Sequence, residues 1–143
     1  MSDLKLRIFK ILRPPQLACL ATVTGEGKPW VRYVFCEADH DLTLRCASLC
    51  NSRKVSQILN NPEVHLSCGA GIPGQKNYLQ IQARAEFRTD IPERLGFWKD
   101  SLKNYFTGPD DPEYGVIVVR PYRIELCTPG VPQPEVWTPE NDS

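Results

Sequence analysis

The chain has 143 residues, which suits one domain with its own hydrophobic core. Lysine and arginine together number 17, and aspartate and glutamate also number 17, so the formal net charge is zero. This balance argues against a nucleic-acid or anionic membrane surface, because both need a strong basic excess. Any binding of an anion is therefore expected to be local. No apolar run approaches the roughly 18 residues of a membrane span.

The first predicted element is a short helix within residues 1–15, ended by a pair of prolines. Lys5, Arg7 and Lys10 interrupt its apolar residues, so the segment lacks the apolar stretch of a signal peptide. The six cysteines contain no Cys-x-x-Cys pair, so neither a zinc site nor a disulfide framework is expected. These features predict a cytoplasmic protein with reduced thiols, most of them buried in strands.

Strand-like segments recur along the chain, and most are joined by short turns. They are residues 17–24, 29–37, 42–47, 63–68, 78–88, 115–120 and 122–126, the last two divided by a proline. Short connections favour antiparallel pairing. We therefore expect a mainly β fold, a small β-barrel with flanking helices, because closure removes exposed strand edges.

Two further helices are predicted between these strands. A short one begins after Ser52 and ends at residues 60–62. A longer one begins at Asp90 with an Asp-x-x-Glu capping pattern, and its apolar face continues to Phe106. Residues 1–127 thus form a single predicted domain, and the proline-rich residues 128–143 are expected to be an extended arm or a disordered tail.

Neither a G-x-G-x-x-G match nor the two histidines lie in a sequence context that supports a binding site. Residues 69–74 read GAGIPG and match G-x-G-x-x-G, but a dinucleotide site needs a helix directly after the glycines. Pro73 and the strand pattern that follows predict a hairpin loop instead. His40 and His65 have no metal-ligand partner at useful spacing, so no metal site is expected.

The short helix after Ser52 begins with two cations, Arg53 and Lys54. A helix N-terminus carries partial positive charge, so each base there costs on the order of 0.3–1 kcal/mol. Together with the hydroxyls of Ser48 and Ser52, however, these cations have the chemistry of a phosphate site. Two solvated cations that tolerate a small cost are the alternative, and the residue pattern leaves both open.

Three residues near this helix have unusual settings. Arg32 lies in a strand with apolar residues on both faces, so we expect the strand to be buried on both sides and Arg32 to need an anionic partner. That partner is either a glutamate of the protein or a ligand phosphate. Arg45 is interpreted as exposed. Cys50 is a candidate reactive thiol, because nearby cations lower a thiol pKa, but a small packing residue is the preferred interpretation.

The order and spacing of four segments, residues 22–35, 42–68, 79–87 and 97–126, resemble the pyridoxamine 5′-phosphate oxidase-like family of FMN-binding split barrels. Within that family the sequence is most similar to the small general-stress-protein type. The resemblance spans about residues 17–126. It implies a six-stranded antiparallel split barrel and a homodimer with FMN at the subunit interface.

The resemblance also assigns residues to the FMN phosphate. Arg32 and Lys54 resemble the family's phosphate ligands. Ser52 and Arg53 belong to the matching Ser-Arg-Lys, and Ser48 stands where the family has a hydroxyl residue after the third strand.

The isoalloxazine ring would lie along the second strand of the barrel. The resemblance places the backbone through Tyr33 and Val34 beside the ring, and Ala47 next to the cofactor at the end of the third strand. Trp98, or alternatively Tyr105, would cover the flavin from the second subunit.

The function implied is an FMN-dependent oxidoreductase of unknown substrate. The C-terminal Arg-x-His substrate element of the true oxidases is absent from the sequence, which argues against oxidation of pyridoxamine phosphate. A non-catalytic flavin-binding or stress-related sensing module is an alternative. A split barrel that uses a deazaflavin or haem is another.

Overall fold

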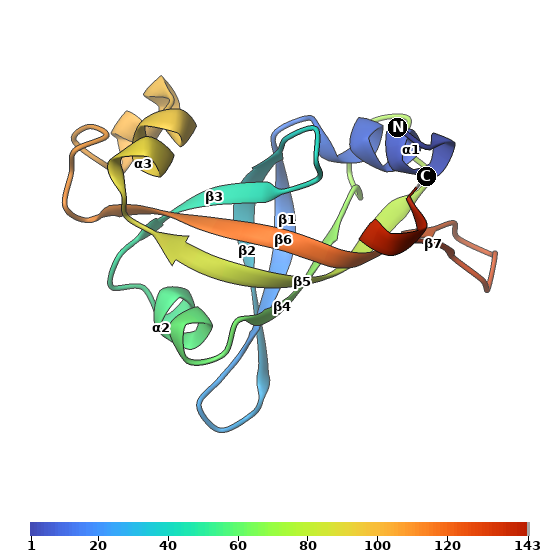
Figure 1. Cartoon of the computed structure of the whole chain (residues 1–143), viewed down its shortest axis with the longest axis horizontal. Coiled ribbons are helices and arrows are strands. Elements are labelled where there is room, and N and C mark those ends of the chain that lie inside the picture. Colours follow the sequence, from blue (N-terminus) through green and yellow to red (C-terminus); the bar gives the residue numbers. More distant parts are fainter. Residues whose placement is uncertain (143) are drawn as a thin grey trace.

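Seven strands of residues 1–142, which the computed structural model describes, form one sheet that closes on itself (Figure 1). The strands are β1 (Gln16–Val23), β2 (Pro29–Ala38), β3 (Leu44–Leu49), β4 (Glu63–Cys68), β5 (Tyr78–Arg88), β6 (Tyr114–Cys127) and β7 (Glu135–Trp137). Their order is β3-β2-β1-β4-β5-β6-β7, and a further pairing of β3 with β6 closes β1 to β6 into an antiparallel barrel. The predicted mainly β fold and its six-stranded barrel are confirmed.

Helices lie at the ends and side of the barrel (Figure 1). They are α1 (Asp3–Leu12), α2 (Arg53–Asn60), α3 (Ile91–Phe97) and the short 3-10 helices η1 (Asp100–Asn104) and η2 (Pro139–Asn141). No helix within residues 1–142 combines the length and the apolar character that crossing a bilayer requires.

The core forms because alternate residues of each strand point into the barrel. In β5, for example, Leu79 and Ile81 are fully buried while Gln80 and Gln82 between and beyond them are exposed. Two helices add apolar side chains to the same core, α1 through Ile8, Ile11 and Leu12, and α2 through Val55 and Ile58. The hairpin loop predicted for residues 69–77 is confirmed, since β4 and β5 pair antiparallel across it.

Two predicted strand boundaries are wrong. Residues 115–120 and 122–126 belong to one strand, β6, because Pro121 faces a shift of register between Gln82 and Ala83. Proline lacks an N–H group, and a bulge is a place where a sheet tolerates that loss. β3 begins at Leu44 rather than at Leu42, since Leu42 adopts a φ of 70° in the preceding turn.

The single long helix predicted from Asp90 is also wrong. Asp90 caps α3 as expected, accepting a hydrogen bond from the backbone N–H of Glu93 at 3.3 Å. The helix nevertheless ends at Phe97, because Trp98 and Lys99 adopt extended backbone before η1 begins. This break turns the chain back onto the barrel, where Trp98 packs against the ring of Tyr114.

Residues 128–142, predicted as an arm or a disordered tail, run back along the barrel. β7 pairs with β6, and Trp137, only 5% exposed, packs in the main core. Two contacts then tie this segment to α1: Asp142 accepts from Ser2 at 2.6 Å, and Glu135 accepts from Arg7 at 2.6 and 2.7 Å. Both ends of the chain consequently lie on the same side of the molecule (Figure 1).

The cysteines within the described residues are free thiols, and Cys36, Cys46, Cys68 and Cys127 are buried, as predicted. Residues 1–142 also contain no group of three or more histidine, cysteine or acidic residues that could hold a metal ion.

Candidate functional site

A cavity of about 640 Å³ lies between β2, the end of β3, the first turn of α2 and the segment 97–106. We call it the β2–α2 cavity. It brings together several of the residues predicted to bind a cofactor, namely Tyr33, Val34, Ala47, Ser48 and Lys54. Its remaining lining is mostly apolar or aromatic, which suits a flat, partly apolar ligand.

The N-terminus of α2 forms the polar part of this region. Ser52 is the N-cap and accepts from the backbone N–H of Val55 at 3.4 Å. Its Oγ lies 3.0 Å from the Oγ of Ser48, which is almost fully buried at the end of β3. The first turn of α2 contains no acidic residue, so nothing in it offsets the positive end of the helix dipole.

Three cations gather beside this helix end, and we call Arg32, Arg53 and Lys54 the cation cluster. Burial lowers the pKa of Arg32, and the charge of Arg53 lowers it further. Burial also lowers the pKa of Lys54, with Arg32 adding to the effect. Within residues 1–142 no carboxylate forms an ion pair with any of the three. The cluster therefore holds positive charge that the described chain does not neutralise.

Neutral oxygens hold Arg32 in place instead of a carboxylate. Its Nη1 donates to the hydroxyl of Thr22 at 2.7 Å and to the backbone carbonyls of Leu20 and Trp30, each at 3.2 Å. Its Nη2 donates to Oε1 of Gln57 at 2.8 Å. Within residues 1–142 the predicted glutamate partner of Arg32 is therefore wrong, and its partners are neutral oxygens. A ligand anion beside Arg32 stays a prediction.

Sequence reasoning missed Thr22 and Gln57. Gln57 follows Arg53 by four residues and Lys54 by three, so helical spacing alone places it on the side of α2 that carries the cations. That spacing was the available signal. For Thr22 the signal was a hydroxyl on the inward face of an apolar strand, where it needs a partner.

The outer face of β2 is apolar and exposed, so the expectation of a strand buried on both sides is wrong for the single chain. Val31, Tyr33 and Phe35 are 62%, 74% and 57% exposed, and Leu17 of β1 lies opposite Phe35. We call these four residues the outer β2 face. It is continuous with the β2–α2 cavity, because Leu17, Tyr33 and Phe35 also line that cavity.

The two aromatic residues proposed to cover the flavin lie in different places. Trp98 does not line the β2–α2 cavity, and its ring packs edge-on against Tyr114 at 5.4 Å. Tyr105 does line the cavity and is 77% exposed. Within this chain, the geometry favours Tyr105 as an aromatic residue available to a ligand.

Cys50 does not have the activated environment expected of a reactive thiol. Burial raises its pKa, and Glu113 raises it further. Its Sγ donates to the carbonyl of Pro112 at 3.4 Å. The expectation of a lowered pKa is wrong, and Cys50 acts as a packing residue.

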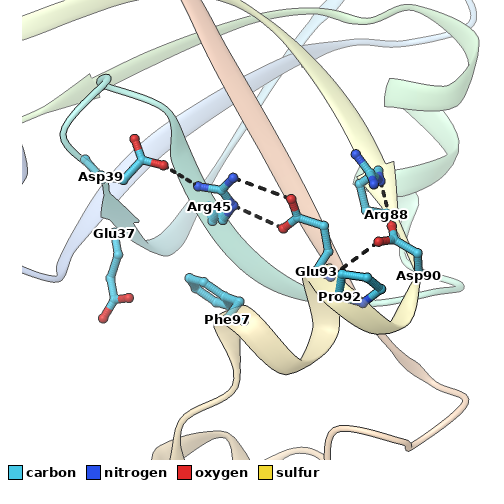
Figure 2. Close-up of a pocket in the computed structure, with 10 residues that line it drawn as sticks. Glu37, Asp39, Arg45, Arg88, Asp90, Pro92, Glu93 and Phe97 are labelled. Carbon is cyan, nitrogen blue, oxygen red and sulfur yellow. Dashed lines mark hydrogen bonds and ion pairs between the residues drawn. The ribbon is translucent and has the colours of Figure 1, made fainter.

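A second pocket, of about 390 Å³, lies between β2, β3, the end of β5 and α3 (Figure 2). Arg45 donates there to Asp39 at 2.6 Å and to Glu93 at 3.1 Å, as Figure 2 shows. Arg88 pairs with Asp90 at 2.6 Å, and Glu37, which also lines the β2–α2 cavity, pairs there with Lys99. We call this region the ion-paired pocket. Arg45, interpreted from sequence as exposed, is half-buried and paired on both sides.

A closed six-stranded antiparallel barrel with a ligand-sized cavity at the end of β3 is the architecture of the split-barrel class of proteins. The family model described as pyridoxamine 5′-phosphate oxidase matches residues 4–128, so the chain belongs to this family.

Individual relatives agree with that assignment. General stress protein 26 of Bacillus subtilis is 29% identical over 134 residues, which cover 92% of this chain and 94% of the relative. The crystal structure of general stress protein 26 from Bacillus anthracis has a TM-score of 0.81 and 27% identity, covering 96% of this chain and 99% of that one. An F420 reductase structure has a TM-score of 0.64 and 25% identity, covering 81% of this chain and 94% of that one. The predicted resemblance to the general-stress-protein type is confirmed.

Proposed function

We propose that this protein is an FMN-dependent oxidoreductase and that the FMN phosphate binds at the N-terminus of α2. One observation carries the proposal: the cation cluster lies beside two serine hydroxyls and a free helix N-terminus, with no carboxylate paired to it in residues 1–142. Like charges gathered at the positive end of a helix repel one another, and a bound anion relieves that repulsion. A phosphate satisfies the cations, the hydroxyls and the helix dipole together.

The rest of the cofactor fits the β2–α2 cavity. Its apolar and aromatic lining suits an isoalloxazine ring, with the backbone through Tyr33 and Val34 along one side and Ala47 nearby. The bound flavin would supply the redox chemistry, while this chain binds the phosphate, orients the ring and excludes water from it.

We further propose a homodimer that covers the outer β2 face. Large exposed apolar patches usually mark an interaction surface. Because this face is continuous with the β2–α2 cavity, a second copy seated on it would complete the wall around the flavin. Tyr105 is the preferred aromatic contact to the flavin, since it is exposed and lines the cavity, whereas Trp98 packs against Tyr114.

The spectrum of the purified protein tests the cofactor. We expect a yellow protein with two visible flavin bands, from which denaturation releases a compound with the mass of FMN. A colourless protein that also fails to bind added FMN would overturn the proposal.

Single substitutions test the phosphate site. Arg32→Ala and Lys54→Ala should each weaken FMN binding by about ten- to a hundredfold, because each removes a charge-assisted contact of roughly 1.5–3 kcal/mol. Lys76→Ala, which changes an exposed lysine in the β4–β5 loop, is the matched control and should leave affinity unchanged. Unchanged affinity in both test variants would show that the phosphate binds elsewhere.

A flavin-binding or sensing module without catalytic activity is the second candidate, favoured by the missing Arg-x-His element. Stopped-flow mixing of the loaded protein with NADH or NADPH, followed by oxygen, separates the two. Flavin that is reduced and reoxidised supports the oxidoreductase, and inert flavin supports the module.

A deazaflavin is the alternative cofactor, because the chain is similar to an F420 reductase. Parallel titrations with FMN, a phosphorylated deazaflavin and haem decide among the three ligands. Preference for the deazaflavin would keep the phosphate site and replace the cofactor. Preference for haem would overturn both the flavin cofactor and the phosphate site, since haem carries no phosphate to bind the cation cluster.

A further inference from the structure

We propose that Thr22 and Gln57 are positioning residues that set Arg32 for phosphate binding without neutralising it. This inference rests on the proposed function and adds residues to the site that the resemblance does not assign. The carrying observation is that the guanidinium of Arg32 is held on two sides by side-chain oxygens of these residues, at 2.7 and 2.8 Å.

Both side chains that accept from Arg32 are uncharged. A carboxylate in their place would fix the guanidinium equally well but would cancel its charge and compete with a bound phosphate. Thr22 and Gln57 fix the geometry and leave the full positive charge of Arg32 available to a ligand. The ion-paired pocket shows the opposite arrangement, since Arg45 there is held by two carboxylates.

The hydrogen bonds of Gln57 define one orientation of its side-chain amide. Its Oε1 accepts both from Nη2 of Arg32 and from the hydroxyl of Thr22. A flipped amide would place its NH2 group against the guanidinium, donor against donor. Thr22 is 1% exposed, so its hydroxyl depends on these partners within the protein.

The hydrogen bonds among Arg32, Thr22 and Gln57 connect three different elements. Arg32 lies on β2, Thr22 on β1 and Gln57 on α2, the helix that also carries Arg53 and Lys54. The hydrogen bonds therefore fix the barrel wall against the helix that binds the phosphate. Loss of Gln57 would release Arg32 from α2 while leaving the other two cations in place.

The expected signature is a loss of preference for the phosphate, because riboflavin shares the ring system of FMN and lacks the phosphate. Gln57→Leu removes the acceptor at similar volume, and Thr22→Val removes the hydroxyl. Each should lower the ratio of FMN affinity to riboflavin affinity by about three- to tenfold, the usual size of one lost hydrogen bond. Gln133→Leu, at an exposed position near the C-terminus, is the matched control.

A charged variant separates positioning from simple packing. Gln57→Glu keeps the size and the acceptor but adds a negative charge beside Arg32. We expect it to reduce FMN preference more than Gln57→Leu does, and to regain affinity as the pH falls toward the pKa of the introduced carboxyl group. A role in packing alone would leave the ratio unchanged in Gln57→Leu, which keeps the volume of the side chain, so the two variants together separate positioning from packing.

The experiment is a titration of the full-length protein with FMN and with riboflavin, followed by flavin fluorescence, and repeated in an Arg32→Ala background. Gln57→Leu should have no further effect there if it acts through Arg32. Circular dichroism identifies any variant that fails to fold, and Thr22→Val then provides the independent test.

Each outcome decides a different statement. A wild-type protein that prefers FMN, with the preference reduced in the variants, supports the inference. An unchanged ratio in both Gln57 variants overturns it while the proposed function stands. A further loss on adding Gln57→Leu to Arg32→Ala also overturns it, since Gln57 would then contact the ligand directly. A wild-type protein that binds neither flavin overturns the proposed function and the inference with it.

Discussion

The ion-paired pocket and the cation cluster differ in whether the chain supplies counter-charges to their cations. In the ion-paired pocket Arg45 has two carboxylate partners, and Arg88 pairs with Asp90. In the cation cluster Arg32, Arg53 and Lys54 have none within residues 1–142. Charges that meet their counter-charges inside the chain serve the fold, whereas charges collected without them are available to a ligand.

The pKa values express the same difference. Hydrogen bonds and attraction from Glu93 and Asp39 outweigh burial at Arg45 and raise its pKa. At Lys54 burial has the largest effect, and the pKa is lowered. The chain thus stabilises the charge of Arg45 and leaves that of Lys54 destabilised until an anion arrives.

The largest difference between the two regions is expected when two cations of the cation cluster are removed at once. The double variant Arg32→Ala/Lys54→Ala should weaken FMN binding by at least about a hundredfold, because two charge-assisted contacts are removed. Isothermal calorimetry or flavin fluorescence measures this. Arg88→Ala, from the ion-paired pocket, serves as the control and should stay within about twofold of the wild type, as expected for a charge outside the site.

For the stability of the fold, we expect the ion-paired pocket to matter more than the cation cluster. Arg45→Ala should lower the free energy of unfolding by about 1–3 kcal/mol, since it leaves Glu93 and Asp39 without their partner in a half-buried setting. Lys54→Ala in the ligand-free protein should not destabilise, because it relieves repulsion within the cation cluster. Urea unfolding followed by circular dichroism compares the two. The comparison fails if Lys54→Ala proves the more damaging.

A smaller effect concerns pH. The pKa of Lys54 lies below its ordinary value of 10.5 in the free protein, and a phosphate binds best to the protonated ammonium. FMN affinity should therefore be complete below the lowered pKa and should fall as the pH rises through it, by up to about tenfold. Lys54→Arg keeps its charge over this range and should remove the decrease. An identical pH profile in both proteins would exclude Lys54 as the titrating group.

The smallest effect is expected at Cys50, which lies in the connection between β3 and α2. Because burial raises its pKa and it packs against Pro112, Cys50→Ser should change FMN affinity by less than about twofold, as expected away from a ligand contact. The thiol should also resist alkylation at neutral pH. Rapid modification accompanied by loss of flavin binding would restore a functional role for this residue.

The sequence was sufficient for features that depend on neighbouring residues. Alternation along β4 and β5 predicted both strands at their observed bounds, and Ser52 and Asp90 cap their helices as expected. Among the predicted residues that line the β2–α2 cavity, Ser48 and Lys54 were indicated by the residue pattern around the helix start. The family resemblance was needed for Tyr33, Val34 and Ala47.

Features that depend on distant contacts could not be predicted in this way. The continuation of β6 through Pro121 depends on a shift of register against β5, where Tyr122 of β6 has no partner in the register, and α3 ends where Trp98 packs on Tyr114. The partners of Arg32 and Arg45 come from other elements, up to 48 residues away in the case of Glu93. Such pairings are set by the closed barrel and leave no periodic signal.

The three tryptophans lie in three distinct settings, so the protein carries its own optical reporters. Trp30 is exposed on β2, Trp98 is half-buried against Tyr114, and Trp137 is buried where the C-terminal segment meets the barrel. Replacing two of them at a time with phenylalanine would leave a single emitter in each protein. Emission from Trp30 would then follow events at β2, that from Trp98 would follow the segment 97–106, and that from Trp137 would follow detachment of the C-terminal strand.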